Sequence, residues 1–219
     1  ATGANINEVA KAIGMDSRIG PKFLQASVGF GGSCFQKDIL NLVYIAKSLG
    51  LQEVADYWHQ VILMNNHQRN RFAKNIIKTL YNTVSGKTIA FLGWAFKKDT
   101  NDTRESAAIY VADQLMDEQA TIKVYDPKVS GTQMQSDLNY LGTRSETENY
   151  LQTETDPYKA LEGAHAIAVL TEWDAFKTYD WQRIYDNMQQ PAFVFDGRNV
   201  LDRVLLEQIG FTYQGVGRL

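Results

Sequence analysis

The segment richest in chemically capable residues is Ser27-Val-Gly-Phe-Gly-Gly-Ser-Cys-Phe-Gln-Lys-Asp38. Its cysteine, Cys34, is the only one in the 219-residue chain, and a cysteine thiolate can attack a carbonyl carbon. A helical pattern begins at Cys34, so the unpaired amides and positive dipole of a helix start favour a thiolate there. Lys37 adds positive charge. Asp38 lies one turn on, on the same helical face, within reach of a water attacking a group bound to the sulfur.

These residues also have structural interpretations. A lone cysteine is usually an inert, buried side chain. In that case Asp38 only ties down the glycine loop, and Lys37 is a solvated surface charge. Gly29, Gly31 and Gly32 favour the chemical interpretation, because backbone without a Cβ lets a ligand approach closely.

A second cluster, Gly93-Trp-Ala-Phe-Lys-Lys-Asp-Thr-Asn-Asp-Thr-Arg-Glu-Ser106, separates an apolar run from a helical pattern. Ligands of open parallel sheets bind at such carboxyl ends of strands. The turn lacks the further glycines of a dinucleotide fingerprint, so NAD is not expected across it. Lys97, Lys98 and Arg104 suit phosphate or carboxylate recognition, and Phe96 can stack on a ligand. The alternative is a solvated, charge-rich loop.

Two further charged residues end predicted strands. Arg198 follows the last apolar run, at the same predicted rim as Lys97, and two cations at one sheet end indicate an anionic ligand. The alternative is an ion pair between Arg198 and a nearby carboxylate, Asp196 or Asp202. Asp126 ends the second strand, where a ribose-binding acid would stand. Without the glycines we interpret it as structural.

Hydrophobic periodicity predicts the elements that position these residues. Helices are expected over residues 5–13, 34–48, 53–81, 104–117, 156–162, 181–188 and 204–208, and strands over 89–92, 122–125, 166–170 and 192–195. The near-continuous apolar character of these strands is typical of a parallel sheet buried on both faces. The polar stretch 130–155 is expected to be a partly helical surface elaboration. The sequence therefore predicts an α/β fold with a doubly wound, Rossmann-like parallel sheet.

The longest predicted helix, 53–81, would extend ~43 Å at 1.5 Å per residue. Such a helix either connects two domains or packs against a partner subunit. The alternative is a kink near Asn65-Asn66, where two polar residues lower helix propensity.

Composition excludes several classes of protein. A net charge of -3 argues against a nucleic-acid binder. The absence of a ~18-residue apolar run or a signal sequence predicts no membrane association and a cytoplasmic location. One cysteine excludes an internal disulfide framework, and the dispersed His59, His67 and His165 do not predict a metal site.

Three motifs together resemble the UDP-glucose 6-dehydrogenase family, particularly its animal members. They are Gly-Phe-Gly-Gly-Ser-Cys-Phe-Gln-Lys-Asp, Phe-Lys-Lys-Asp-Thr with the following Asp-Thr-Arg-Glu-Ser, and Phe-Asp-Gly-Arg. The similarity runs through the chain in the family's order and spacing. It implies that the chain corresponds to a carboxy-terminal part lacking the NAD-binding amino-terminal domain, which is not expected to turn over alone. Residues 1–85 would be a central helical dimerisation region with the cysteine loop, and residues 86–219 a UDP-sugar-binding α/β domain.

The resemblance implies oxidation of UDP-glucose to UDP-glucuronate with two NAD molecules. The cysteine matching Cys34 would form a thiohemiacetal and then a thioester, which water hydrolyses with help from Asp38. The implied partners are these sugar nucleotides and a second copy of the chain, in a homodimer that becomes a hexamer in the full-length enzyme.

The resemblance also assigns contact residues. Those implied for the sugar nucleotide are Arg18, Phe23, Gln25, Ala26, Ser27, Val28, Gly29, Phe30, Gly31, Phe35, Phe96, Lys97 and Arg198, and those for the cofactor are Cys34, Phe35, Gln36, Lys37 and Arg104. Arg18 matches an arginine that reaches the site of a neighbouring subunit. Two positions depart from the family pattern: Asn101 replaces a common glycine, and Gln25 replaces a lysine found in some relatives.

Other functions stay open at this stage. Dehydrogenases of GDP-mannose or of a UDP-hexosamine share the cysteine loop. A dimerising, nucleotide-sugar-binding module without catalysis is a second alternative. A thiol hydrolase is a third, remote alternative that nothing in the sequence supports, and the lack of a histidine near Cys34 in the sequence does not exclude it.

Overall fold

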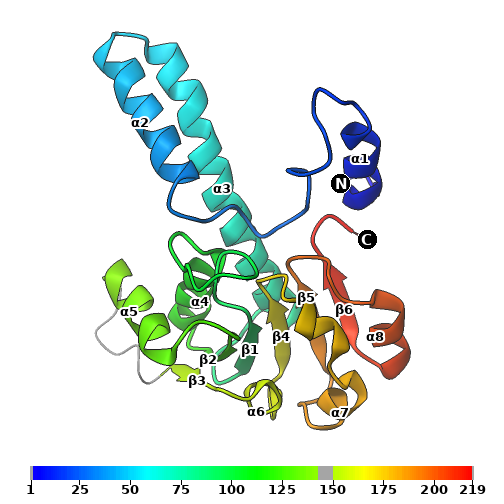
Figure 1. Cartoon of the computed structure of the whole chain (residues 1–219). Helices are drawn as coiled ribbons and strands as arrows, with labels where there is room; N and C mark the ends of the chain where they lie inside the picture. The colour runs from blue at the N-terminus through cyan, green and yellow to red at the C-terminus, as the bar shows by residue number, and fades with distance from the viewer. Residues whose placement is uncertain (1, 143–149, 219) are drawn as a thin grey trace.

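The computed structural model describes residues 2–142 and 150–218. Figure 1 shows an α/β unit from which a pair of long helices projects, with the first helix standing apart beside the carboxy-terminal end. The helices before the sheet are α1 (Ile6–Gly14), α2 (Phe35–Ser48) and α3 (Gln52–Thr79). They lie close to the ranges expected from the sequence.

Helix α3 is a single unbroken helix of 28 residues, as the periodicity predicted. Its first half packs on α2 around buried apolar residues that include Ile39, Val43 and Ile62. Its second half contributes Phe72 and Ile76 to the core beneath the sheet. The helix therefore connects the projecting hairpin to the α/β unit.

The sheet has six parallel strands in the order β3-β2-β1-β4-β5-β6, which is typical of a Rossmann fold. Its strands are β1 (Thr88–Leu92), β2 (Thr121–Tyr125), β3 (Leu151–Thr153), β4 (Ala166–Val169), β5 (Phe193–Asp196) and β6 (Thr212–Gly215). The four strands predicted from apolar runs are confirmed. The two edge strands, β3 and β6, were missed because a strand at an edge need not be apolar on both faces.

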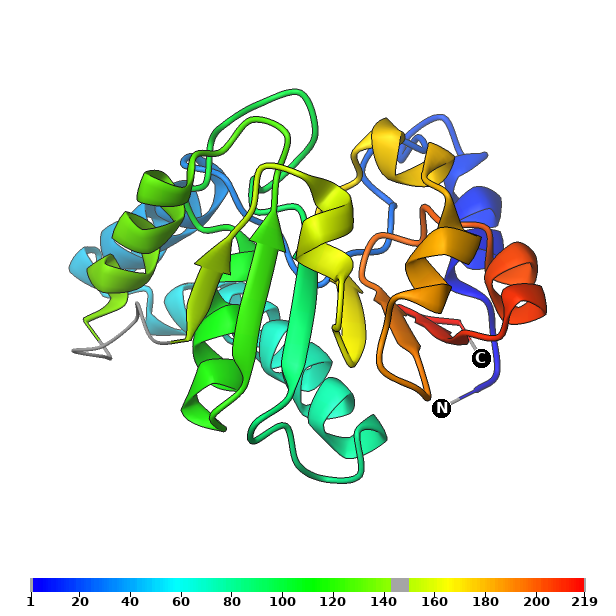
Figure 2. The same cartoon turned by 90° about the horizontal axis from the view of Figure 1, so that it is seen from below.

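Helices cover both faces of the sheet (Figure 2). They are α4 (Ala107–Asp117), α5 (Gly131–Leu141), α6 (Pro157–Leu161), the short 3₁₀ helix η2 (Asp174–Thr178), α7 (Trp181–Asp186) and α8 (Arg203–Ile209). Alternate residues of β1 enter different cores: Ile89 and Phe91 pack with α3, α4 and α5, whereas Ala90 and Leu92 pack with α6, α7 and α8. This alternation confirms the doubly wound arrangement. The stretch 130–155 contains the expected helical part, α5, and residues 143–149 lie outside the described residues.

Asp126, at the end of β2, is buried and organises the neighbouring loop. One carboxylate oxygen accepts hydrogen bonds from the amides of Trp94 and Ala95 at 2.7 and 3.1 Å and from the indole of Trp173 at 3.2 Å. The other accepts from the amides of Lys128 and Val129 at 2.8 and 3.0 Å. These bonds support the structural interpretation of Asp126, because they occupy the carboxylate with backbone and indole donors.

Within the described ranges, no helix combines the length and apolar character needed to cross a membrane. The same residues include no group of three histidine, cysteine or acidic side chains placed to hold a metal ion.

Candidate functional site

A cavity of about 1000 Å³ opens at the carboxyl ends of the central strands. Lys97, Glu172 and Arg198 reach it from the loops after β1, β4 and β5. The segment 22–31 and one side of α3 form its other walls. The structure thus brings Lys97 and Arg198 to one rim, as the sequence predicted.

Most residues assigned to the sugar nucleotide line this cavity. They are Phe23, Gln25, Ser27, Gly29, Phe30, Gly31, Phe96, Lys97 and Arg198. Four others lie elsewhere. Val28 is buried in the core, Ala26 lines a second cavity beside Ser27, Phe35 is exposed at the start of α2, and Arg18 is exposed and bound to Asp16. The ligand contacts of these four residues stay predictions.

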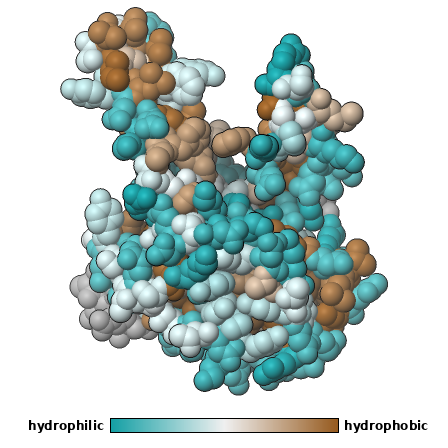
Figure 3. All heavy atoms as spheres, in the orientation of Figure 1, coloured by the Kyte–Doolittle hydropathy of each residue, from teal (hydrophilic) through white to brown (hydrophobic). Residues whose placement is uncertain are grey.

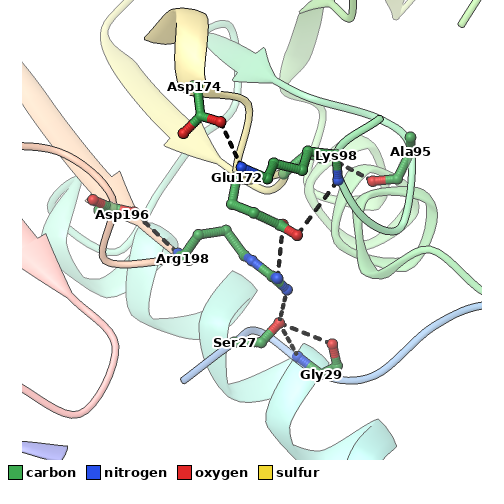
Figure 4. Close-up of polar contacts among 9 residues, drawn as sticks. Ser27, Gly29, Ala95, Lys98, Glu172, Asp174, Asp196 and Arg198 are labelled. Atoms are coloured by element: carbon green, nitrogen blue, oxygen red, sulfur yellow. Dashed lines mark hydrogen bonds and ion pairs between the residues drawn. The ribbon is translucent and has the colours of Figure 1, made fainter. Parts of the chain in front are cut away.

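The guanidinium of Arg198 is fixed by two side chains (Figure 4). It pairs with the carboxylate of Glu172 at 2.7 Å and donates to the hydroxyl of Ser27 at 2.6 Å. The Ser27 hydroxyl in turn donates to the carbonyl of Gly29 at 2.9 Å. Hydrogen bonds through Ser27 therefore connect the Arg198 guanidinium to the glycine loop.

Glu172 is a site residue that the sequence pattern did not predict. The carboxylates predicted as partners of Arg198 were Asp196 and Asp202. Asp196 instead accepts from the backbone amide of Arg198 at 3.0 Å, and Asp202 caps α8. The available signal was the position of Glu172, an acid following the apolar run of β4 at the same rim.

The three cations of the loop after β1 have different surroundings. Lys97 is exposed, lines the cavity and lies 5.3 Å from the centre of the Phe96 ring. Lys98 pairs with Asp174, and Arg104 donates two hydrogen bonds to the carboxylate of Asp102 at 2.8 and 2.9 Å. Arg104 lowers the pKa of that carboxyl below its usual value. Of the three, Lys97 is the cation best placed to meet a ligand in this cavity.

Cys34 stands directly before α2, as its position in the sequence predicted. The thiol is exposed, with the Ser33 hydroxyl 3.5 Å from its sulfur. Asp38 is exposed one turn further on, and its amide donates to the carbonyl of Cys34 at 2.8 Å. As far as the described residues define the cavity, Cys34 lies outside its lining. Phe30 of the lining and the exposed Phe35 next to Cys34 meet edge to face, with ring centres 4.7 Å apart.

The glycine loop packs tightly on the charged loop after β1. A Cβ on Gly31 would lie 2.6 Å from the carbonyl oxygen of Glu105 and 2.9 Å from the Cβ of Phe96. Gly32, with φ +91°, has its own amide bonded to the carbonyl of Arg104 at 2.8 Å. Gly31 is required because two stretches of backbone meet there, and Gly32 is favoured by its positive φ.

Two polar residues of α3, Asn65 and Arg69, anchor the loop from below. The Asn65 side chain accepts from the Phe30 amide at 2.9 Å and donates to the Phe30 carbonyl at 3.1 Å. Arg69 donates to the carbonyls of Phe30 and Glu105 at 2.9 and 2.8 Å. From the sequence alone, Asn65 is expected only as the site of a possible kink. The missed signal was helical spacing, which puts both residues on the buried face between Ile62 and Phe72.

The residues assigned to the cofactor lie around the start of α2. Cys34, Phe35 and Lys37 are exposed, and Gln36 carries a buried amide oxygen without a partner in the described part of the chain. The pKa of Arg104 is raised, chiefly by its hydrogen bonds to Asp102 and to a smaller extent by the Cys34 side chain. The cofactor contacts of these residues stay predictions.

Comparisons with known proteins agree with this geometry. Residues 90–203 match the UDP-binding domain of the UDP-glucose/GDP-mannose dehydrogenase family, and residues 1–67 match its central domain. The UDP-glucose 6-dehydrogenase of Caenorhabditis elegans is 57% identical over 217 residues, covering 99% of this chain and 45% of that protein. UDP-glucose 6-dehydrogenase 5 of Oryza sativa subsp. japonica is 55% identical over 229 residues, covering 100% of this chain and 48% of that protein.

Among solved structures, a UDP-glucose dehydrogenase from the hyperthermophilic archaeon Pyrobaculum islandicum is 28% identical with a TM-score of 0.76. The similarity covers 99% of this chain and 44% of that one. The chain spans about half the length of the curated relatives it matches. On the matched domains, the chain belongs to the UDP-glucose/GDP-mannose dehydrogenase family.

Proposed function

We propose that this chain forms the nucleotide-sugar-binding and nucleophile-bearing part of a UDP-glucose 6-dehydrogenase, which converts UDP-glucose to UDP-glucuronate. The observation that carries the proposal is the cavity in which Lys97 and Arg198 meet beside the glycine loop that leads to Cys34. The names of the relatives support UDP-glucose as the substrate.

In this proposal, Arg198 and Lys97 bind the anionic nucleotide. Arg198 is the stronger candidate because Glu172 and Ser27 already hold its guanidinium, so little side-chain entropy is lost on binding. Phe96 and Phe23 supply aromatic surface on two sides of the cavity. Arg18, held by Asp16 away from this cavity, would serve the site of a second copy.

The proposed chemistry centres on Cys34. Its thiolate adds to the C6 aldehyde of the half-oxidised sugar and gives a thiohemiacetal. Loss of hydride from C6 gives a thioester, and water then releases the carboxylate and regenerates the thiol. Asp38, one helical turn after Cys34, would take the proton of that water. NAD, when bound, supplies the hydride acceptor for both oxidation steps, and Cys34 to Lys37 with Arg104 would contact it from this side.

We also propose that residues 1–85 act as the dimerisation region and residues 86–219 as the sugar-nucleotide-binding domain, in a cytoplasmic enzyme. The proposal of a dimer is supported by exposed apolar side chains on the projecting hairpin, among them Ile45, Leu49 and Tyr57.

Calorimetric titration of this chain with UDP-glucose and UDP-glucuronate tests the proposal, with GDP-mannose as the comparison ligand. We expect binding of both UDP sugars, loss of binding on Arg198→Ala, and at least several-fold weakening on Lys97→Ala. Lys98→Ala is the matched control, since Lys98 carries the same charge in the same loop but pairs with Asp174. Tighter binding of GDP-mannose would contradict the assigned substrate, and equal losses in all three variants would contradict the assigned site.

A further inference from the structure

Arg69 of α3 is a charged side chain in the core, with only 2% of its surface exposed. Burial lowers the pKa of its guanidinium, so neighbouring groups must compensate for lost water. Two neighbouring residues supply this compensation. The Arg69 guanidinium lies 4.1 Å from the centre of the Tyr110 ring, and its Nη1 atom is 3.7 Å from the carboxylate of Glu105. Tyr110 donates to the same carboxylate at 2.7 Å.

One nitrogen of Arg69 joins two loops. It donates to the carbonyl of Phe30, four residues before Cys34, and to the carbonyl of Glu105, the residue after Arg104. The two loops also meet directly, through the hydrogen bond of 2.8 Å from the amide of Gly32 to the carbonyl of Arg104. The backbone next to the thiol and the backbone next to the Arg104 guanidinium therefore share one support.

The two loops also bring the Cys34 side chain and the Arg104 guanidinium into one neighbourhood. The pKa of Arg104 is raised chiefly by its hydrogen bonds to Asp102, with a minor contribution from Cys34. Arg104 itself is exposed, so its position depends on the backbone of its loop and on its bonds to Asp102. A change in the support of the loop is expected to change the distance from this cation to the sulfur.

We propose that Arg69 is a positioning residue that fixes the loop carrying the Cys34 thiol relative to the loop carrying the Arg104 cation. The meaning of this arrangement for catalysis rests on the proposed role of Cys34 as the nucleophile. A lysine at this position keeps the charge. It lacks the planar group that stacks on Tyr110 while it bonds both carbonyls and faces the Glu105 carboxylate.

Alkylation of Cys34 tests this proposal, because it is the only cysteine of the chain. Second-order rate constants are measured at one pH and low salt with anionic iodoacetate and with neutral iodoacetamide. Their ratio reports positive charge near the sulfur and is insensitive to general changes in exposure. Arg104→Met should lower the ratio by about twofold to fourfold, as expected for removal of one exposed unit charge on the neighbouring loop. Arg69→Lys should lower it to a similar extent.

Arg71→Lys is the matched control, since Arg71 is exposed two residues further along the same helix, and it should leave the ratio unchanged. Tyr110→Leu, which removes the ring beside Arg69, should lower the ratio and provides a second test if Arg69→Lys unfolds. If Arg69→Lys and Tyr110→Leu both leave the iodoacetate-to-iodoacetamide ratio at the value of the unchanged chain, the proposal is overturned. The same holds if Arg104→Met leaves this ratio unchanged. Failure of UDP-sugar binding in the parent chain would overturn the proposed function and leave these ratios meaningful.

Discussion

At the scale of single residues, the cavity contains an ion pair between Arg198 and Glu172. Arg198, the cation best placed for an anionic ligand, is already paired with Glu172 at 2.7 Å. Both side chains are largely buried, with 14% and 19% of their surfaces exposed, so water screens their attraction less than on an open surface. An incoming phosphate therefore competes with the carboxylate of Glu172 for the same guanidinium.

Glu172→Gln is expected to tighten binding of UDP-glucose by about threefold or more, because it removes a negative charge that opposes the ligand and keeps a hydrogen-bonding side chain. Titration calorimetry at two salt concentrations measures the change, which should shrink at high salt. Asp174→Asn, which removes an acid that pairs with Lys98, is the control and should leave affinity unchanged. Weaker binding by Glu172→Gln would mean that the carboxylate is needed to aim Arg198.

At the scale of elements, α3 has two kinds of neighbour. Its apolar residues pack on α2 and on the sheet, and between these contacts Asn65 and Arg69 hold the glycine loop. The glycine loop cannot move away from α3 without breaking these partly buried hydrogen bonds. Its position is therefore set jointly by α3 below and by the loop after β1 beside it.

Gly31→Ala should push the glycine loop away from the loop after β1, because the added Cβ would lie 2.6 Å from the Glu105 carbonyl oxygen. Relief of this clash requires the backbone of one loop to move. We expect UDP-glucose affinity to fall at least tenfold, with a clear loss of thermal stability. Gly50→Ala is the comparison. Gly50 has φ +73° and open space around it, so strain should cost about 1 kcal/mol of stability and leave affinity intact. Unchanged affinity in Gly31→Ala would show that the two loops move apart without consequence for the cavity.

At the scale of the whole molecule, apolar surface is concentrated on the projecting hairpin. Figure 3 shows brown, hydrophobic side chains gathered at its tip, where Ile45, Leu49 and Leu51 are about half exposed or more. The periodicity of the sequence predicts an apolar side of this helix made of Ile39, Leu42, Val43, Ile45, Ala46 and Leu49. In the structure Ile39, Val43 and Ala46 face inward as predicted, whereas Leu42, Ile45 and Leu49 are exposed.

We expect sedimentation velocity to detect a concentration-dependent dimer of this chain, because burial of the hairpin's apolar surface is favourable. The double variant Ile45→Lys with Leu49→Lys should shift it to monomer without a large change in thermal stability. Val204→Lys with Leu205→Lys, on the exposed side of α8, is the matched control and should leave the dimer intact. Equal behaviour of the two double variants would contradict dimerisation through the hairpin.

Local pattern determined much of this molecule. The four inner strands are rich in apolar residues because both faces of a parallel sheet are covered, although Lys123 interrupts the run of β2. Cys34 precedes a helix because the helical periodicity starts there. The convergence of Lys97 and Arg198 followed from the rule that parallel strands end at one edge. Each of these inferences depends on neighbours in the sequence or on a general property of the fold.

Tertiary structure alone decided the rest, since it concerns contacts between residues far apart in the chain. The partners of Arg198 are Ser27 and Glu172, and Phe30 binds Asn65 and Arg69 across the interior. A charged or polar side chain forms hydrogen bonds with the groups that tertiary packing brings within about 3 Å of it. Hydrophobic periodicity does not predict which groups these are. The edge strands β3 and β6 likewise form through hydrogen bonds to a neighbouring strand. Their own residues therefore need not show a recognisable strand pattern.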